Sequence, residues 1–193
     1  EPRVVPAPEG SRAGEVMELG SPDATLTIFE YASLTCPGCA MFHAQILPEI
    51  KETYIDTGKV RFEFREFPAN PQTLAYAGFY LSRCAATQKG SPAYFAMIDT
   101  LFKRQRDWAY GPTPGETLEE IAAQAGINRE ALQDCCFREE VKAAVAQNVT
   151  AGIEQHKVGG TPTFIVNDEP FEWGRSAESM AAAIDAELAK LEQ

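Results

Sequence analysis

Strand-like segments lie at both ends of this chain, with a long helical stretch between them. Near the start, Leu26 and Ile28 alternate with threonines, and residues 60–65 alternate large apolar with charged side chains. Residues 73–156 have apolar side chains at three- and four-residue spacing, which predicts a nearly continuous helical block. Strand and helix patterns return in residues 163–191. The order β, α, β, helical block, β, β, α predicts an α/β fold with a large helical insertion.

Composition narrows the class of protein. The chain has 193 residues, enough for one ordinary domain or one domain with an insertion, and its 45% hydrophobic residues can fill a core. The formal net charge of −11 argues against binding to nucleic acid or to anionic lipid, because both favour a cationic surface. No run approaches the roughly 20 apolar residues of a membrane span, so we expect no transmembrane segment.

The ends and turns of the chain carry further local signals. Residues 1–22 are rich in Pro, Gly, Ser and Glu, and we expect an extended, mostly mobile arm there. The stretch 36–57 is helical in pattern, with Pro48 interrupting it, and Asn167–Asp168 predicts a hairpin turn. The chain begins at Glu1 with no Met and no apolar leader, as the mature form of an exported protein would.

The strongest chemical signal is Cys36-Pro37-Gly38-Cys39, a C-x-x-C motif where a strand ends and a helix begins. Unpaired N–H groups and the positive end of the helix dipole favour an anion there, so Cys36 can be a thiolate near neutral pH. Pro37 suits the first helical turn, where its missing N–H has no intrahelical partner anyway. The spacing brings the Cys39 sulfur close enough for a disulfide that opens and re-forms, as thiol–disulfide exchange requires.

Two other interpretations of this motif stay open. It could be half of a zinc site, but such a site needs four ligands, and the chain has no second C-x-x-C and only two histidines, His43 and His156. Cys135 and Cys136 are adjacent, which is a poor geometry for two ligands of one metal. A purely structural disulfide would close so short a loop that it constrains little of the unfolded chain. We therefore expect no metal and no organic cofactor.

Glu30 lies six residues before Cys36 and, on the strand period, shares a face with the apolar residues of its strand. A carboxylate on an apolar face is costly and needs a reason. We interpret it as a buried group that exchanges a proton with Cys39; the alternative is a glutamate at the sheet edge that points to solvent. His43 lies four residues after Cys39 on the same helical face, where it either tunes the site or has no role.

A second motif, Val158-Gly159-Gly160-Thr161-Pro162-Thr163-Phe164, occurs much later in the chain. Together with the C-x-x-C and the preceding Glu30, it resembles the DsbA-like branch of the thioredoxin superfamily, over roughly residues 20–193. The resemblance implies a thioredoxin fold with an inserted helical domain. The boundaries that it implies are an N-terminal arm at 1–22, a thioredoxin-fold domain at 23–70 and 157–193, and an inserted helical domain at 71–156.

The resemblance also implies roles for single residues. Cys36 would be the exposed nucleophile and Cys39 the buried resolving cysteine, with Glu30 as the buried acid beneath them. Pro162 would be a cis-proline that faces the disulfide. Thr161 would offer its backbone to an extended substrate peptide, as in the addition of a strand.

Members of this family are exported thiol–disulfide oxidoreductases that usually oxidise newly secreted proteins. The resemblance implies a monomer in the periplasm or another exported location. This monomer would form disulfides in thiol-containing polypeptides, and a quinone-linked membrane protein would reoxidise it. Strong oxidants of the family have histidine where this chain has Gly38, so only the helix terminus and backbone N–H groups remain to stabilise the thiolate. The alternatives are a disulfide isomerase or reductase of the same fold, and a non-enzymatic peptide-binding chaperone whose C-x-x-C binds zinc or is inert.

The other three cysteines are expected in a packed interior, because Cys84 borders one apolar helical stripe and Cys135 and Cys136 lie on another. Similar family members often have a cysteine pair at the positions of Cys84 and Cys135, and an exported protein would oxidise it. We expect that disulfide, with Cys136 as a buried free thiol. Adjacent helical residues point about 100° apart, so the pattern alone leaves open a Cys84–Cys136 link, and also two buried cysteines that stay unpaired.

Overall fold

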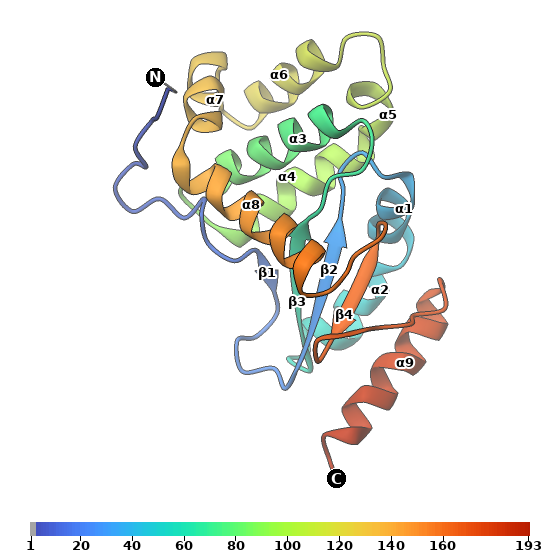
Figure 1. The fold of residues 1–193 in the computed structure, drawn as a ribbon. Helices are drawn as coiled ribbons and strands as arrows, with labels where there is room; N and C mark the ends of the chain where they lie inside the picture. Colours follow the sequence, from blue (N-terminus) through green and yellow to red (C-terminus); the bar gives the residue numbers. More distant parts are fainter. Residues whose placement is uncertain (1–2) are drawn as a thin grey trace.

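A five-stranded sheet forms the centre of the protein, in a computed structural model that describes residues 3–193 (Figure 1). The strands are β1 (Glu18–Leu19), β2 (Leu26–Ala32), β3 (Val60–Glu66), β4 (Thr163–Val166) and β5 (Glu169–Pro170). They are arranged in the order β1-β3-β2-β4-β5, with β2 parallel to β3 and the other neighbours antiparallel. The first two residues of the expected arm lie outside the described part of the chain.

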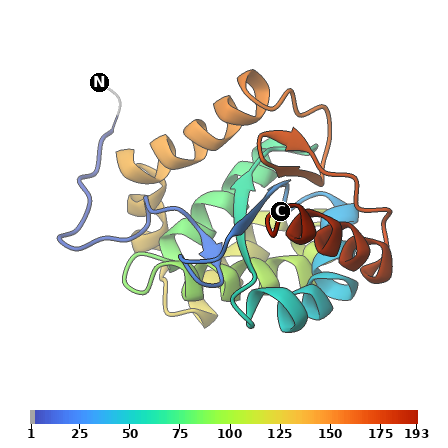
Figure 2. The same cartoon turned by 90° about the horizontal axis from the view of Figure 1, so that it is seen from below.

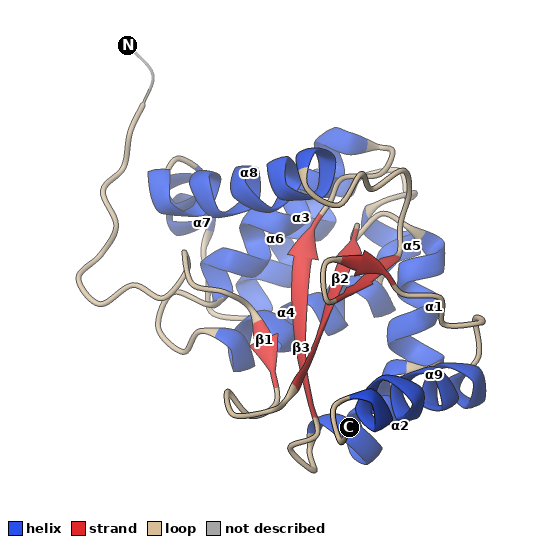
Figure 3. Ribbon diagram, turned by 60° about the horizontal axis from the view of Figure 1, so that its bottom comes forward, coloured by secondary structure: helices blue, strands red, loops and turns tan. Residues whose placement is uncertain are grey.

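Helices connect and cover these strands. Their bounds are α1 (Pro37–Gln45), α2 (Leu47–Ile50), the π-helical turn η1 (Lys51–Ile55), α3 (Gln72–Ala85), α4 (Ser91–Lys103), α5 (Gln105–Trp108), α6 (Pro114–Gln124), α7 (Arg129–Cys136), α8 (Glu139–Glu154) and α9 (Ala177–Lys190). Helices α3 to α8 are all inserted between β3 and β4, as the helical pattern of the sequence predicts. Figure 3 shows α2 and α9 together beside the strands, with α7 and α8 on the far side.

Two apolar clusters make up most of the core. One face of the sheet, with Ile28 and Phe62 at its centre, packs against α1, α2 and α9. The second cluster joins the end of the sheet, at Ala32 and Phe64, to the inserted helices, and it includes both cysteines of the C-x-x-C. The insertion therefore shares a core with the segment that carries the motif. Within residues 3–193, no helix is both long and apolar enough to cross a membrane.

The N-terminal segment is extended, as expected, and most of its side chains are exposed, but Ala13 and Met17 anchor it in the core. Figure 2 shows its described part, from residue 3 to β1, along the outside of the molecule. Ala13 and Met17 are fully buried or nearly so, and Arg83 donates hydrogen bonds to the carbonyls of Ala13 and Glu15, both at 2.9 Å. Glu66 holds the same guanidinium at 2.7 Å in a buried ion pair. Two isolated anchors give no periodic pattern, so the sequence analysis missed them.

The expected local breaks occur where the sequence places them. The helical stretch 36–57 is divided into α1, α2 and η1, and the first interruption falls at Ile46, two residues before Pro48. Asn167 and Asp168 both have positive φ, 52° and 62°, in the turn between β4 and β5. Positive φ at both central residues is typical of a type I′ hairpin turn, so the predicted hairpin is confirmed.

Candidate active site

The C-x-x-C begins at the N-terminus of α1, directly after the loop that follows β2. Cys36 is the N-cap residue of α1, and its sulfur accepts a hydrogen bond from the backbone N–H of Cys39 at 3.4 Å. Pro37 occupies the first turn, where its missing N–H costs no hydrogen bond. Cys36 was expected to be exposed, but it is mostly buried, because only 9% of its surface is exposed; it is still more accessible than Cys39, which is fully buried.

The two sulfurs also differ in acidity. The pKa of Cys36 is lowered to about 6, chiefly by hydrogen bonding with the Cys39 thiol and further by Thr161 and the backbone N–H groups of Cys39 and Gly38, while burial opposes the shift. The pKa of Cys39 is raised well above its usual value, first by burial, then by Cys36 and by the charge of Glu30. Near neutral pH the site thus has a thiolate at Cys36, the more accessible sulfur, and a protonated thiol at the fully buried Cys39.

The second motif lies against the first. The Thr161–Pro162 peptide bond is cis, and the carbonyl oxygen of Thr161 is 3.4 Å from the Cys36 sulfur. Gly38 faces the same place: a Cβ added there would lie 3.5 Å from Pro162 Cδ and 3.7 Å from the Cys36 sulfur. A cavity of about 340 Å³ begins at Pro162 and extends to the segment 171–175 after β5. The two motifs that carry the family resemblance are therefore one site.

Glu30 lies on the buried face of β2, beneath this site. It is fully buried between β3 and β4, and its Oε2 is 2.8 Å from Nε2 of His43 on α1. Its second oxygen, Oε1, is buried without a hydrogen-bond partner among residues 3–193. The alternative of a solvent-facing glutamate is wrong, and His43 does contact the site. Glu30 acts on the dithiol through its charge, which raises the pKa of Cys39.

Two residues near the site gave no signal in the sequence. Gln105 on α5 and Tyr110, in the segment that follows, both donate hydrogen bonds to backbone carbonyls of the loop before Cys36. Both come from the insertion between β3 and β4, and Gln105 lies in a polar stretch with no apolar pattern. Only the packing of the insertion against the motif brings them to the site.

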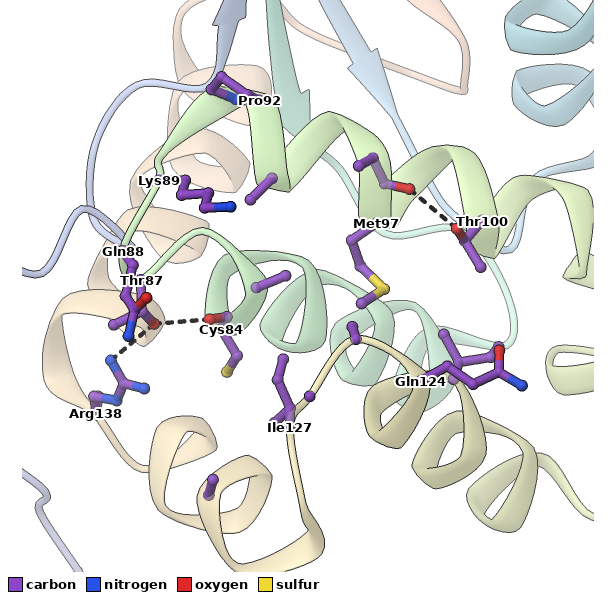
Figure 4. Close-up of a pocket in the computed structure, with 17 residues that line it drawn as sticks. Cys84, Thr87, Gln88, Lys89, Pro92, Met97, Thr100, Gln124, Ile127 and Arg138 are labelled. Atoms are coloured by element: carbon purple, nitrogen blue, oxygen red, sulfur yellow. Dashed lines mark hydrogen bonds between the residues drawn. The ribbon is translucent and has the colours of Figure 1, made fainter.

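The remaining cysteines lie elsewhere. Cys84 on α3 and Cys135 on α7 form a disulfide, as the resemblance implies. Cys136 is free but half-buried rather than buried, because it is on the neighbouring face of α7, and its burial raises the pKa of its thiol. A separate cavity of about 850 Å³ lies beside Cys84. Figure 4 shows its lining, with Arg138 donating a hydrogen bond to Thr87. This larger cavity is lined by the inserted helices and does not include the C-x-x-C.

Comparison with known proteins agrees with this geometry. Residues 12–186 match a family model described as "Thioredoxin". The chain is 35% identical over 173 residues to a Rickettsia prowazekii protein called "Putative protein-disulfide oxidoreductase", with 89% of this chain and 61% of that protein aligned. It thus spans about three fifths of the length of this relative, and 63% of the similar protein of Rickettsia bellii. A Bacillus subtilis relative, "Disulfide bond formation protein D", is 25% identical over 88% of this chain and 76% of its own length.

Solved structures show the same fold. The crystal structure of alpha-DsbA1 from Wolbachia pipientis matches with a TM-score of 0.77 and 26% identity, over 91% of this chain and 92% of that one. Oxidised BdbD from Bacillus subtilis matches in fold with a TM-score of 0.76 and 24% identity, over 97% and 100% of the two chains. The family match, the thioredoxin-like sheet with its inserted helices and the paired motifs lead to one conclusion: this chain belongs to the DsbA-like family of thioredoxin-fold disulfide oxidoreductases.

Proposed function

We propose that the protein is a thiol:disulfide oxidoreductase that introduces disulfides into exported polypeptides through Cys36 and Cys39. The observation that carries this proposal is the contrast between the two sulfurs: the pKa of Cys36 is about 6, whereas that of Cys39 is well above its usual value. A stabilised thiolate favours the reduced form of the dithiol, so the disulfide form becomes an oxidant. The direction of exchange is therefore towards oxidation of the substrate.

The reaction has two exchange steps. A substrate thiolate attacks the Cys36 sulfur, the Cys36–Cys39 bond breaks, and Cys39 leaves as a thiolate that takes up a proton. The second substrate thiol loses its proton and attacks the substrate sulfur in the mixed disulfide, and Cys36 leaves as a thiolate. The substrate loses two electrons and gains a disulfide, and the enzyme gains both electrons as a dithiol.

The buried pair of Glu30 and His43 would supply the proton that Cys39 needs. The two groups are 2.8 Å apart, both are nearly or fully inaccessible to solvent, and the Glu30 charge already acts on Cys39. Thr161 and Pro162 would hold the substrate as an extended peptide beside the Cys36 sulfur, next to the cavity at Pro162.

The proposal includes a redox partner, because each turnover leaves the enzyme reduced. By analogy with the family, a quinone-linked membrane protein would reoxidise Cys36 and Cys39 outside the cytoplasm, and the enzyme would work as a monomer without an organic cofactor or metal. Such a compartment also suits the Cys84–Cys135 disulfide.

A stoichiometric oxidation assay tests the proposal. The disulfide form is mixed with a reduced peptide that carries two cysteines, and peptide disulfide is followed by mass spectrometry. We expect one peptide disulfide per enzyme, none with Cys36→Ser, and an unchanged yield with the paired Cys84→Ala and Cys135→Ala variant. Failure to oxidise the peptide, together with rapid reduction of insulin by the dithiol form, would favour a reductase instead.

A further inference from the structure

Three consecutive backbone carbonyls before α1 accept hydrogen bonds from the inserted helices. Nε2 of Gln105 donates to the carbonyl of Leu34 at 2.8 Å and to that of Cys36 at 3.0 Å, and the hydroxyl of Tyr110 donates to the carbonyl of Thr35. The carbonyls of Leu34 and Thr35 lie before the N-cap of α1, so its N–H groups do not satisfy them in the helical pattern, whereas that of Cys36 also accepts from the N–H of Ala40. We call Gln105 and Tyr110 the carbonyl clamp.

The clamp is anchored in the core. Trp108, on the same short helix as Gln105, is fully buried and donates from its indole N–H to the carbonyl of Leu101 at 2.8 Å. Gly78 on α3 leaves room for the loop and the helix to meet, because a Cβ there would lie 3.0 Å from Leu34 Cδ1 and 3.2 Å from Trp108 Cη2. Gln105 itself is 6% exposed, so its amide has little access to water as an alternative partner.

We propose that the carbonyl clamp is a positioning device for the nucleophile, which keeps the Cys36 sulfur at the N-terminus of α1. The loop it holds leads directly into Cys36, whose sulfur must stay within 3.4 Å of the Cys39 N–H for the helix terminus to stabilise the thiolate. A hydrogen bond donated to a carbonyl oxygen also offsets part of the negative partial charge of that oxygen, which would otherwise repel a nearby thiolate. The inference rests on the proposed function only in taking Cys36 as the nucleophile.

The titratable groups that interact with Cys36 are consistent with this role. Cys39, from α1, is the main cause of the low pKa of Cys36. Tyr110 is the second titratable group near Cys36: burial, and then the charge on Cys36, raise the pKa of the Tyr110 phenol. The hydroxyl therefore remains a donor over the range in which Cys36 ionises, and the clamp stays closed in both states of the sulfur.

Substitution of Gln105 by methionine tests the clamp, because methionine keeps the length of the side chain and removes both hydrogen bonds. The measurement is the pKa of Cys36 in the reduced protein, from thiolate absorbance at 240 nm between pH 4 and 9. A net hydrogen bond corresponds to about a two- to tenfold change in an equilibrium. We expect the thiol–thiolate equilibrium of Cys36 to shift towards the thiol by that factor. The same substitution at the exposed Gln124, in the same helical block, should leave it unchanged.

Tyr110→Phe is the second variant, since it removes one hydroxyl from a side chain that is 53% exposed and leaves the core intact. Tyr110→Phe should also shift the thiol–thiolate equilibrium of Cys36 towards the thiol. If the Gln105 variant does not fold, this variant alone tests whether the carbonyl clamp positions the sulfur. A tenfold shift would lower the reduction potential by about 30 mV. Unchanged Cys36 titration in the folded variants, even with a lower melting temperature, would reduce the clamp to a structural contact. The titration measures the sulfur itself, so it succeeds or fails independently of whether the enzyme oxidises substrates.

Discussion

Replacing Cys39 with alanine removes the contact that does most to lower the pKa of Cys36. With that pKa at about 6, roughly nine tenths of Cys36 is thiolate at pH 7. A hydrogen bond to a charged group contributes about 1.5–3 kcal/mol, which corresponds to one to two pKa units. We therefore expect the pKa of Cys36 to rise to about 7–8 in Cys39→Ala, since Thr161 and the backbone N–H groups remain. The thiolate fraction at pH 7 would fall to between about a half and a tenth.

The assay is the rate of Cys36 alkylation by iodoacetamide between pH 4 and 10, with the labelled site identified by mass spectrometry. Cys39→Ser is the matched control, because its hydroxyl can still donate to the Cys36 sulfur, so its profile should stay closer to that of the wild type. Both variants carry Cys136→Ser, which removes the remaining free thiol of the described chain. Equal alkylation profiles for the alanine and serine variants, both at the wild-type pKa, would refute the role given to the Cys39 thiol.

Three further predictions concern the buried acid, the disulfide and pH. Glu30→Gln should lower the pKa of Cys39, because the carboxylate charge raises it, and absorbance at 240 nm in an alkaline titration measures that pKa. His43→Gln, which keeps a donor for Glu30, should disturb the pKa of Cys39 less, and an unchanged Cys39 pKa in Glu30→Gln would contradict the role given to the carboxylate. Replacing both Cys84 and Cys135 by alanine should cost about 4 kcal/mol of unfolding free energy in urea, since the bridge closes a separation of 51 residues; a loss below 1 kcal/mol would show that the bridge does not restrain the unfolded chain as assumed. The pKa of Cys36 is lower in the folded than in the unfolded protein. Ionised Cys36 therefore adds to the free energy of unfolding at pH values above its unfolded pKa, and this stabilisation is lost as pH falls through about 6. The reduced form should therefore gain stability relative to the disulfide form between about pH 6 and 8.5, and urea titrations that show a constant difference would contradict the assigned pKa.

Local chemistry made the central part of the site predictable from sequence. The C-x-x-C at a strand–helix junction and the carboxylate on an apolar strand face each have a local physical meaning, and the structure brings them together with Thr161 and Pro162, whose role came from the family resemblance. The family resemblance supplied what residue patterns could not, namely the relation between two motifs far apart in the chain. It also supplied the partner of Cys84, which helical periodicity had left open between two adjacent cysteines.

The contacts made by the insertion were not predictable in this way. Gln105 has no apolar period and no motif around it, and its role depends on how α5 packs against the loop before α1. The N-terminal segment posed a similar problem, because Ala13 and Met17 are single anchors in a stretch that otherwise resembles a free arm. Cys136 was expected to be buried with its neighbour, yet a helix turns adjacent side chains onto different faces. For Gln105 and the N-terminal segment, tertiary packing determines the contacts, and the local sequence pattern does not.

The reduction potential of the Cys36–Cys39 pair tests the central claim most directly. The protein is equilibrated with glutathione redox buffers, and the fraction of dithiol is measured after acid quenching and alkylation. The pKa of Cys36 is about 6, and Gly38 stands where the strong oxidants of the family have histidine. We therefore expect the Cys36–Cys39 disulfide to be less oxidising than those of the strongest oxidants. We expect a value between about −230 and −120 mV, on the oxidising side of thioredoxin. A value at or below about −270 mV would contradict the proposal that this dithiol acts as an oxidant.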